Sequence, residues 1–278
     1  MSNIKTFVGG LALRFVGVSA RKMYDPSLCR LLHLDDTVNR AKRIASALGL
    51  SLREMALVEI AAAFQDYVYE SVIQSTNDSL LFRVPVKGNK ERSAESAVSW
   101  MKSQTNENFT EDDFQIVTKA ILVTEHSYSE ENKTFIQERL QPDSHPVVRT
   151  VALADLGCAG MESGRFLGEV NRQFLKQNVS IFLFMINKEI CFHRSIGHEL
   201  QELHLDQYLK HLDSSIDFVK GRKNLFETEL GNLGLLDKYL VRMLFSGFDR
   251  SISSLTERRG LSATASFEEL IDYLNSFM

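Results

Sequence analysis

The sequence predicts an all-α protein, and two kinds of observation lead to this fold class. Three segments start with the pattern of a helix-capping box, in which a Ser or Thr precedes an acidic residue by three positions. They are Ser51–Glu54, Thr110–Asp113 and Ser266–Glu269. Behind these starts, apolar residues recur three and four positions apart, which places them on one face of a helix. We therefore expect a helical bundle held together by interhelical packing.

The first helices are expected on either side of His33. Residues 28–32 look helical, and Asp35–Asp36 is a candidate N-cap for a second helix that stops at Gly49. The capping box at Ser51 then opens a central helix with a wide apolar face. The stretch Leu57–Tyr69 belongs to this helix and carries one polar pair, Gln65–Asp66.

Polar connections separate the following helices. Residues 74–91 contain Pro85 and Gly88 and are expected to form a loop with a short extended piece. A loop of this length beside a candidate site often acts as a lid or a binding loop. A helix should follow from Asn89 to about Lys102.

The helix that begins at Thr110 is expected to lead to His126 at its end. After a polar loop with two prolines, residues 147–156 should form a short helix that carries Asp155. Farther on, Ile181–Ile190 is densely apolar, and Leu205–Leu230 and Leu235–Phe245 are amphipathic. Amphipathic helices must bury their apolar stripes, so these C-terminal helices are the expected surface for a homodimer or another partner.

The composition is that of a soluble globular protein. Of 278 residues, 44% are hydrophobic and 24% are charged, which is ordinary for this class. We expect an N-terminal segment over residues 1–30, a helical domain over 31–175, and a C-terminal helical extension over 176–278 packed on the same core. The net charge of −4 gives no electrostatic reason to expect nucleic-acid binding.

Cysteine usage and hydropathy suggest a cytoplasmic location. The three cysteines are far apart and form no C-x-x-C motif, as expected in a reducing compartment. The apolar stretch Phe7–Val18 is interrupted by Arg14 and does not read as a signal peptide. The apolar run over 180–186 is too short to span a bilayer. We therefore expect no membrane association.

Titratable side chains on separate predicted helices form a candidate site. Asp66 lies in an apolar turn, where a carboxylate is costly to bury unless it is paired or binds a metal. His33 precedes it, and His126 and Asp155 follow. On spacing alone, surface or core histidines and helix-capping acids are the simpler interpretation. His198–Glu202 starts like a zinc-binding H-E-x-x-H motif but ends in Glu, so we interpret it as an exposed polar face.

Five segments in order are similar to the HD superfamily of metal-dependent phosphohydrolases, and the similarity covers about residues 30–230. The segments are Glu59–Asp66, Asn89–Ala97, Ile121–His126, Ala152–Met161 and Phe218–Phe226. The resemblance implies an HD-domain-like helical bundle, with the C-terminal helices as an addition to it.

The resemblance also implies roles for individual residues. In that family a first histidine, an adjacent His-Asp pair and a distant aspartate hold a divalent metal. These positions match His33, Asp66 and Asp155. His126 matches a further histidine that acts on a second metal or on the substrate phosphate, so Asp66 and His126 are the candidate catalytic residues. Gln65 stands where the family has the histidine of the pair.

Two functions follow and stay open. The first is a metal-dependent phosphohydrolase acting on a phosphomonoester or nucleotide, with Mn, Ni, Fe, Zn or Mg bound. Lys90 and Arg92 are its candidate phosphate-binding residues, from their charge and position. The second is a catalytically inactive HD-like scaffold that binds a ligand or a protein. It is motivated by Gln65, because a carboxamide oxygen is a weaker ligand than an imidazole nitrogen for most of these metals.

Overall fold

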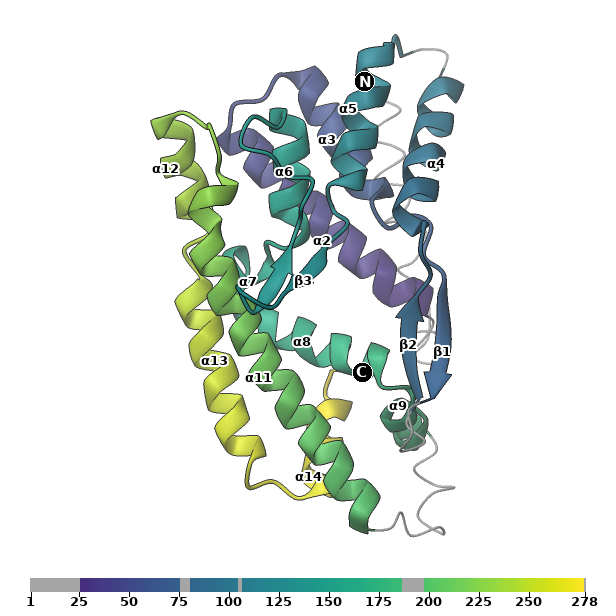
Figure 1. Cartoon of the computed structure of the whole chain (residues 1–278), viewed down its shortest axis with the longest axis vertical. Coiled ribbons are helices and arrows are strands. Elements are labelled where there is room, and N and C mark those ends of the chain that lie inside the picture. Colours follow the sequence, from purple (N-terminus) through teal and green to yellow (C-terminus); the bar gives the residue numbers. More distant parts are fainter. Residues whose placement is uncertain (1–25, 76–80, 105–106, 187–197, 278) are drawn as a thin grey trace.

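A computed structural model describes residues 26–75, 81–104, 107–186 and 198–277, and this part is mostly helical (Figure 1). The helical fold class is confirmed, and two small antiparallel hairpins add to it. The helices are α2 (Pro26–Ala47), α3 (Leu52–Phe64), α4 (Asn89–Ser103), α5 (Glu111–Leu122), α6 (Pro146–Asp155), α7 (Cys158–Met161), α8 (Ser163–Gln177), α9 (Val179–Ile186), α11 (His198–Glu229), α12 (Leu235–Leu244), α13 (Phe248–Ser262) and α14 (Phe267–Asn275). The hairpins pair β1 (Ser71–Ser75) with β2 (Leu81–Pro85), and β3 (Ser127–Ser129) with β4 (Thr134–Ile136).

Helix α3 is the centre of the upper half of the molecule in Figure 1. Helices α2, α4, α5 and α6 pack against it. The run Leu57–Phe64 is therefore buried on every side, including the carboxylate-bearing Glu59, which pairs with Lys42 at 3.3 Å. Because neighbours surround the helix, its apolar residues occupy all faces rather than one stripe.

The helix starts predicted from capping boxes are confirmed. Ser51, Thr110 and Ser266 each accept a hydrogen bond from the backbone N–H three residues later. The acidic side chain at that later position in turn accepts a hydrogen bond from the backbone N–H of the cap residue. Gly49 ends the preceding helix with a φ of +60°, in the left-handed region that glycine adopts without steric cost.

Two predicted boundaries around the first helices are wrong. Helix α2 runs without interruption from Pro26 to Ala47, so Asp35 and Asp36 lie inside it and cap nothing. Asp36 instead forms a two-pronged ion pair with Arg165, at 3.1 Å for each bond. The central helix is shorter than predicted: α3 ends at Phe64, and Gln65 is its C-cap.

Two predicted loops contain hairpins. The segment expected as a loop over 74–91 holds the second half of the β1–β2 pair, and α4 then starts at Asn89 as predicted. Helix α5 ends at Leu122, so His126 lies beyond the helix, directly before β3. Strands of three to five residues leave too little alternation for a sequence pattern to reveal them.

The lower half of the molecule in Figure 1 is built from the C-terminal helices. The long helix α11 runs antiparallel to α13, and α8 packs against both. A buried polar chain crosses this core: Tyr208 donates to Asn171 Oδ1 at 2.7 Å, and Asn171 Nδ2 donates to the Tyr273 hydroxyl at 2.9 Å. Burial lowers the pKa of His204 and of His211, so desolvation favours neutral rings in both.

A buried arginine joins the loop before α6 to the end of α11. Arg149 donates to the carbonyls of Gln141 and Pro142, both at 2.8 Å, and to that of Glu229. Gly231 lies against the same guanidinium with a φ of +55°, and a Cβ at this glycine would come within 2.5 Å of Arg149 Nη2. The position therefore requires glycine for two separate reasons.

Replacing Gly231 with alanine should cost more stability than replacing Gly49 with alanine. Both glycines have left-handed backbones, but an added Cβ at Gly49 meets nothing within 4 Å. We expect G49A to lower the free energy of unfolding by about 1 kcal/mol, and G231A by about 3 kcal/mol because it adds overpacking. Urea unfolding of the two variants measures the difference. Equal losses would show that the Arg149 contact does not constrain Gly231.

Candidate functional site

The ends of three helices meet near the middle of the molecule. Helices α3, α5 and α6 pack on one another and run in the same direction in Figure 1, so their C-terminal ends lie on the same side of the bundle. The predicted residues Asp66, His126 and Asp155 all follow or end these helices. Helix C-termini carry partial negative charge, so this region favours a cation.

Position 33 belongs to α2, which packs against both α3 and α6. The fold therefore brings together α2, which carries position 33, α6, which ends at Asp155, and α3, which ends two residues before Asp66. The side chain of His33 itself lies outside the part of the chain that the structure describes.

A lysine ammonium joins the polar pair at the end of α3. Lys90 Nζ lies 2.7 Å from Asp66 Oδ1 and 3.1 Å from Gln65 Oε1. Gln65 is fully buried, and the Lys90 and Asp66 side chains are mostly buried. Lys90 is the second residue of α4, so this contact links the first turn of α4 to the end of α3.

Other side chains of the same turn hold the chain that follows Asp66. Asn89 accepts from the backbone N–H of Glu70 at 3.2 Å and donates to its carbonyl at 3.0 Å. Ser93 accepts from the N–H of Val68 at 2.9 Å. Arg92 donates to Glu70 Oε1 at 2.7 Å and to Asn89 Oδ1 at 2.8 Å. These bonds fix the position from which Lys90 reaches Gln65 and Asp66.

Lys90 and Arg92, predicted to bind phosphate, thus have partners within the protein. The hydrogen bond from Arg92 lowers the pKa of the Glu70 carboxyl, which keeps the pair ionised. Sequence reasoning did not identify Gln65 and Asp66 as partners of Lys90, and no spacing rule connects them, because a hairpin separates the two segments.

Asp155 lies at the end of α6 beside a glutamine that sequence reasoning missed. Gln137 Nε2 donates to Asp155 Oδ2 at 3.4 Å and to the Ala152 carbonyl at 3.2 Å. Gln137 directly follows β4, and its buried Oε1 finds no hydrogen-bond partner among the described residues. The β3–β4 hairpin thereby holds one edge of the site.

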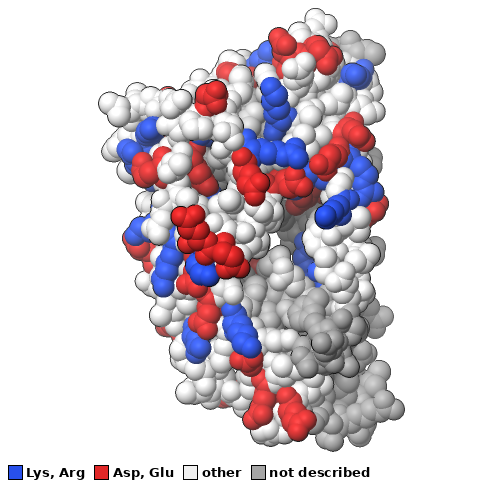
Figure 2. Space-filling model, viewed as in Figure 1, with Lys and Arg blue, Asp and Glu red and all other residues white. Residues whose placement is uncertain are grey.

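His126 is exposed at the base of the same hairpin. Its ring packs edge-on against Phe135 with the centroids 4.9 Å apart, and its Nδ1 lies 3.3 Å from the Thr124 carbonyl. Figure 2 shows a hollow near the middle of this face of the molecule. The described contacts of His126 are those of a packed surface residue, and its side chain is exposed to solvent.

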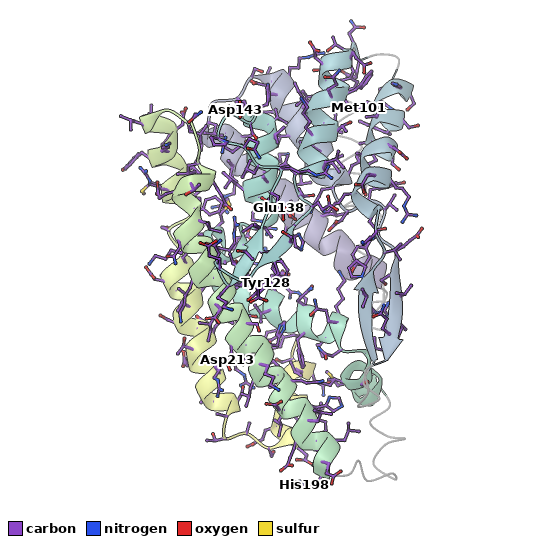
Figure 3. All side chains as sticks on the ribbon, in the orientation of Figure 1. Met101, Tyr128, Glu138, Asp143, His198 and Asp213 are labelled. Atoms are coloured by element: carbon purple, nitrogen blue, oxygen red, sulfur yellow. The ribbon has the colours of Figure 1, made fainter. Side chains whose placement is uncertain are left out.

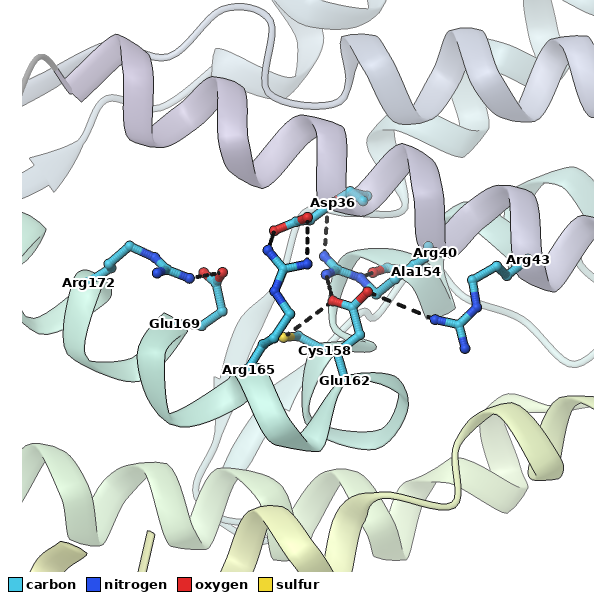
Figure 4. A network of polar contacts seen from close by, with 10 residues as sticks. Asp36, Arg40, Arg43, Ala154, Cys158, Glu162, Arg165, Glu169 and Arg172 are labelled. Atoms are coloured by element: carbon cyan, nitrogen blue, oxygen red, sulfur yellow. Dashed lines mark hydrogen bonds and ion pairs between the residues drawn. The ribbon is translucent and has the colours of Figure 1, made fainter. Parts of the chain in front are cut away.

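A buried arginine fixes the end of α6 (Figure 4). Arg40 of α2 donates to the Ala154 carbonyl at 2.8 Å, to Glu162 at 3.0 Å and to the Thr37 hydroxyl at 3.0 Å. Ala154 directly precedes Asp155, so this network sets where the predicted ligand stands. Burial raises the pKa of the neighbouring Cys158 thiol to about 12, which makes it inert as a nucleophile.

In the described residues, Gln65 and Asp66 are engaged by a cation of the protein rather than open to a divalent metal. The oxygens of Gln65 and Asp66 already accept from one ammonium, which offers no lone pair to a metal and repels a second cation. Within the described ranges, no group of three His, Cys, Asp or Glu side chains could hold a metal ion.

The motif-like segment His198–Glu202 lies at the far end of α11, away from these helix ends (Figure 3). His198 Nδ1 and Glu202 are 3.3 Å apart on an exposed surface, as expected for a polar helix face. Among the described helices, none has the length and apolar character needed to cross a membrane.

Comparison of this chain with models of known protein families, with curated proteins and with solved structures finds no match.

Proposed function

We propose that this protein is a catalytically inactive HD-like scaffold that binds a partner, and that a lysine takes the place of the metal ion. One observation carries the proposal: the ammonium of Lys90 lies on the oxygens of Gln65 and Asp66. The resemblance to HD proteins puts a metal-binding His-Asp pair at these two positions.

Gln65 and Lys90 suit each other chemically. An ammonium is a compact charge with three donors and no acceptor, so it needs oxygen acceptors around it. The amide oxygen of Gln65 supplies one, whereas a histidine nitrogen protonated at this place would repel it. The positive charge of Lys90 is also stabilised by the partial negative charge of the helix C-termini that meet here. The Lys90 charge thus offsets the Asp66 carboxylate without a metal, and Gln65 adds no charge of its own.

A metal-dependent phosphohydrolase acting on a phosphomonoester or nucleotide is the second candidate. It is favoured by the mutual packing of α2, α3 and α6, which carry or closely precede the positions that the resemblance assigns to metal ligands. This function requires Lys90 to leave Asp66, which would free its ammonium for a substrate phosphate.

Elemental analysis separates the two functions. The full chain, purified without chelator and then incubated with manganese, nickel, zinc or iron, should retain much less than one metal ion per chain. It should also release no phosphate from a panel of phosphomonoesters and nucleotides. About one tightly bound metal per chain, together with metal-dependent phosphate release, would overturn the scaffold and establish the hydrolase.

A further inference from the structure

Helix α12 carries an exposed apolar stripe. Leu235, Leu236, Tyr239 and Met243 are 87%, 70%, 57% and 60% exposed. At 100° per residue these four positions fall within about a quarter of the helix circumference. Figure 2 shows an uncharged surface over α12, at the upper left of the molecule. Large apolar side chains gathered in this way mark an interaction surface more often than single exposed leucines do.

The opposite face of α12 is already used by the core. Val241 is fully buried, and Phe245, just after the helix, stacks on Phe226 at 4.6 Å. Helix α12 is therefore apolar on both faces. A helix with this pattern is normally covered on both, and among the described residues of a single copy nothing covers the outer stripe.

We infer that the cover is a second copy of this chain, with the two α12 helices packed antiparallel about a two-fold axis at Tyr239. A two-fold interface must be self-complementary, with each contact made twice. The stripe has this symmetry, because Leu235 lies four residues before Tyr239 and Met243 lies four residues after it. Tyr239 then faces its own copy, while Leu235 of each protomer meets Met243 of the other.

The area is sufficient for such a pair. A fully exposed large side chain presents roughly 150–200 Å², so the four residues offer on the order of 500 Å² per protomer. Two copies would bury on the order of 1,000 Å², the lower bound for a specific interface, before any rim residue is counted.

The charges beside the stripe fit a two-fold pair as well. Arg242 forms a two-pronged pair with Glu227 of α11, at 2.7 Å for each bond, and Lys238 lies on the same edge. Both cations lower the pKa of Glu227, so it stays ionised between them. A two-fold axis brings this edge against the same edge of the partner. Because the edge carries both positive and negative charges, it can form a polar rim around the apolar contact.

Sedimentation of the full chain tests the inference. The wild-type chain of 31.6 kDa should sediment as a dimer at micromolar concentration, and Leu235→Glu/Tyr239→Glu should sediment as a monomer with an unchanged circular dichroism spectrum. Leu261→Glu is the matched control, because Leu261 is also 60% exposed but lies on α13; it should remain dimeric. A monomeric wild-type chain, or a dimer that the double variant leaves intact, would overturn the proposal.

Cross-linking tests the antiparallel arrangement. In a background with Cys29 and Cys191 replaced by serine, Tyr239→Cys should form a disulfide-linked dimer under mild oxidation. Leu235→Cys alone should not, whereas an equimolar mixture of Leu235→Cys and Met243→Cys chains should. Linking by Leu235→Cys alone would overturn the two-fold axis at Tyr239. None of these results depends on whether the Lys90 site binds a metal.

Discussion

Replacing Arg40 with methionine is expected to lower the free energy of unfolding by about 3–5 kcal/mol, the range for breaking a buried ion pair from one side. The Arg40 side chain is only 2% exposed and binds Glu162 at 3.0 Å. Methionine fills most of the same volume but leaves the Glu162 carboxylate without its main cation. The carbonyl of Ala154 loses a donor as well. Urea unfolding, followed by circular dichroism, measures the loss.

Arg43 provides the matched control, because it approaches the same acid. Its guanidinium lies 3.9 Å from Glu162, and its side chain is 48% exposed. A solvent-screened pair of this kind contributes at most about 1 kcal/mol, so Arg43→Met should change the free energy of unfolding very little. The double variant Arg40→Met/Glu162→Gln should recover part of the loss, because it removes the unpaired charge. Similar losses for Arg40→Met and Arg43→Met would contradict a buried role for Arg40.

The local parts of this fold could be predicted from the sequence, and the long-range parts could not. The capping boxes at Ser51, Thr110 and Ser266 involve residues three positions apart, so the pattern and the contact coincide. Asp36 has the same helix-capping chemistry. Its partner Arg165 is 129 positions away. This ion pair compensates the Asp36 carboxylate at a position inside α2. No local pattern distinguishes the two situations.

The candidate site shows the same difference between what local patterns predict and what long-range contacts decide. Asp66 and Asp155 stand out in the sequence because a carboxylate in an apolar stretch is costly to bury, and the structure places them at the ends of packed helices. Lys90 stands out only by its charge, and a free cation near a site suggests phosphate. The fold instead directs it to Gln65 and Asp66, because Asn89, Arg92 and Ser93 dock the first turn of α4 against residues 68–70. Such docking depends on a hairpin that the sequence pattern does not reveal.

If Lys90 takes the place of a metal ion, changing Gln65 to histidine and Lys90 to methionine should allow a metal to bind. The expected result is that Gln65→His/Lys90→Met binds about one zinc, nickel or manganese ion per chain, whereas the wild-type chain binds none. Histidine returns a nitrogen ligand next to Asp66, and methionine removes the competing charge while it keeps the volume of the lysine stem. Elemental analysis after desalting gives the stoichiometry.

The single variants decide whether the two changes act together. Gln65→His alone should stay metal-free, because the ammonium remains on Asp66. Lys90→Met alone should also stay metal-free and should unfold at lower urea concentration, because the carboxylate of Asp66 loses its cation.

In the double variant, saturating metal should raise the stability by about 2.7 kcal/mol at one hundred times the dissociation constant. A double variant that neither binds metal nor gains stability with it would contradict the HD-like arrangement of positions 33, 66 and 155. Metal binding by Gln65→His alone would show that Lys90 is a displaceable neighbour rather than the substitute for the ion.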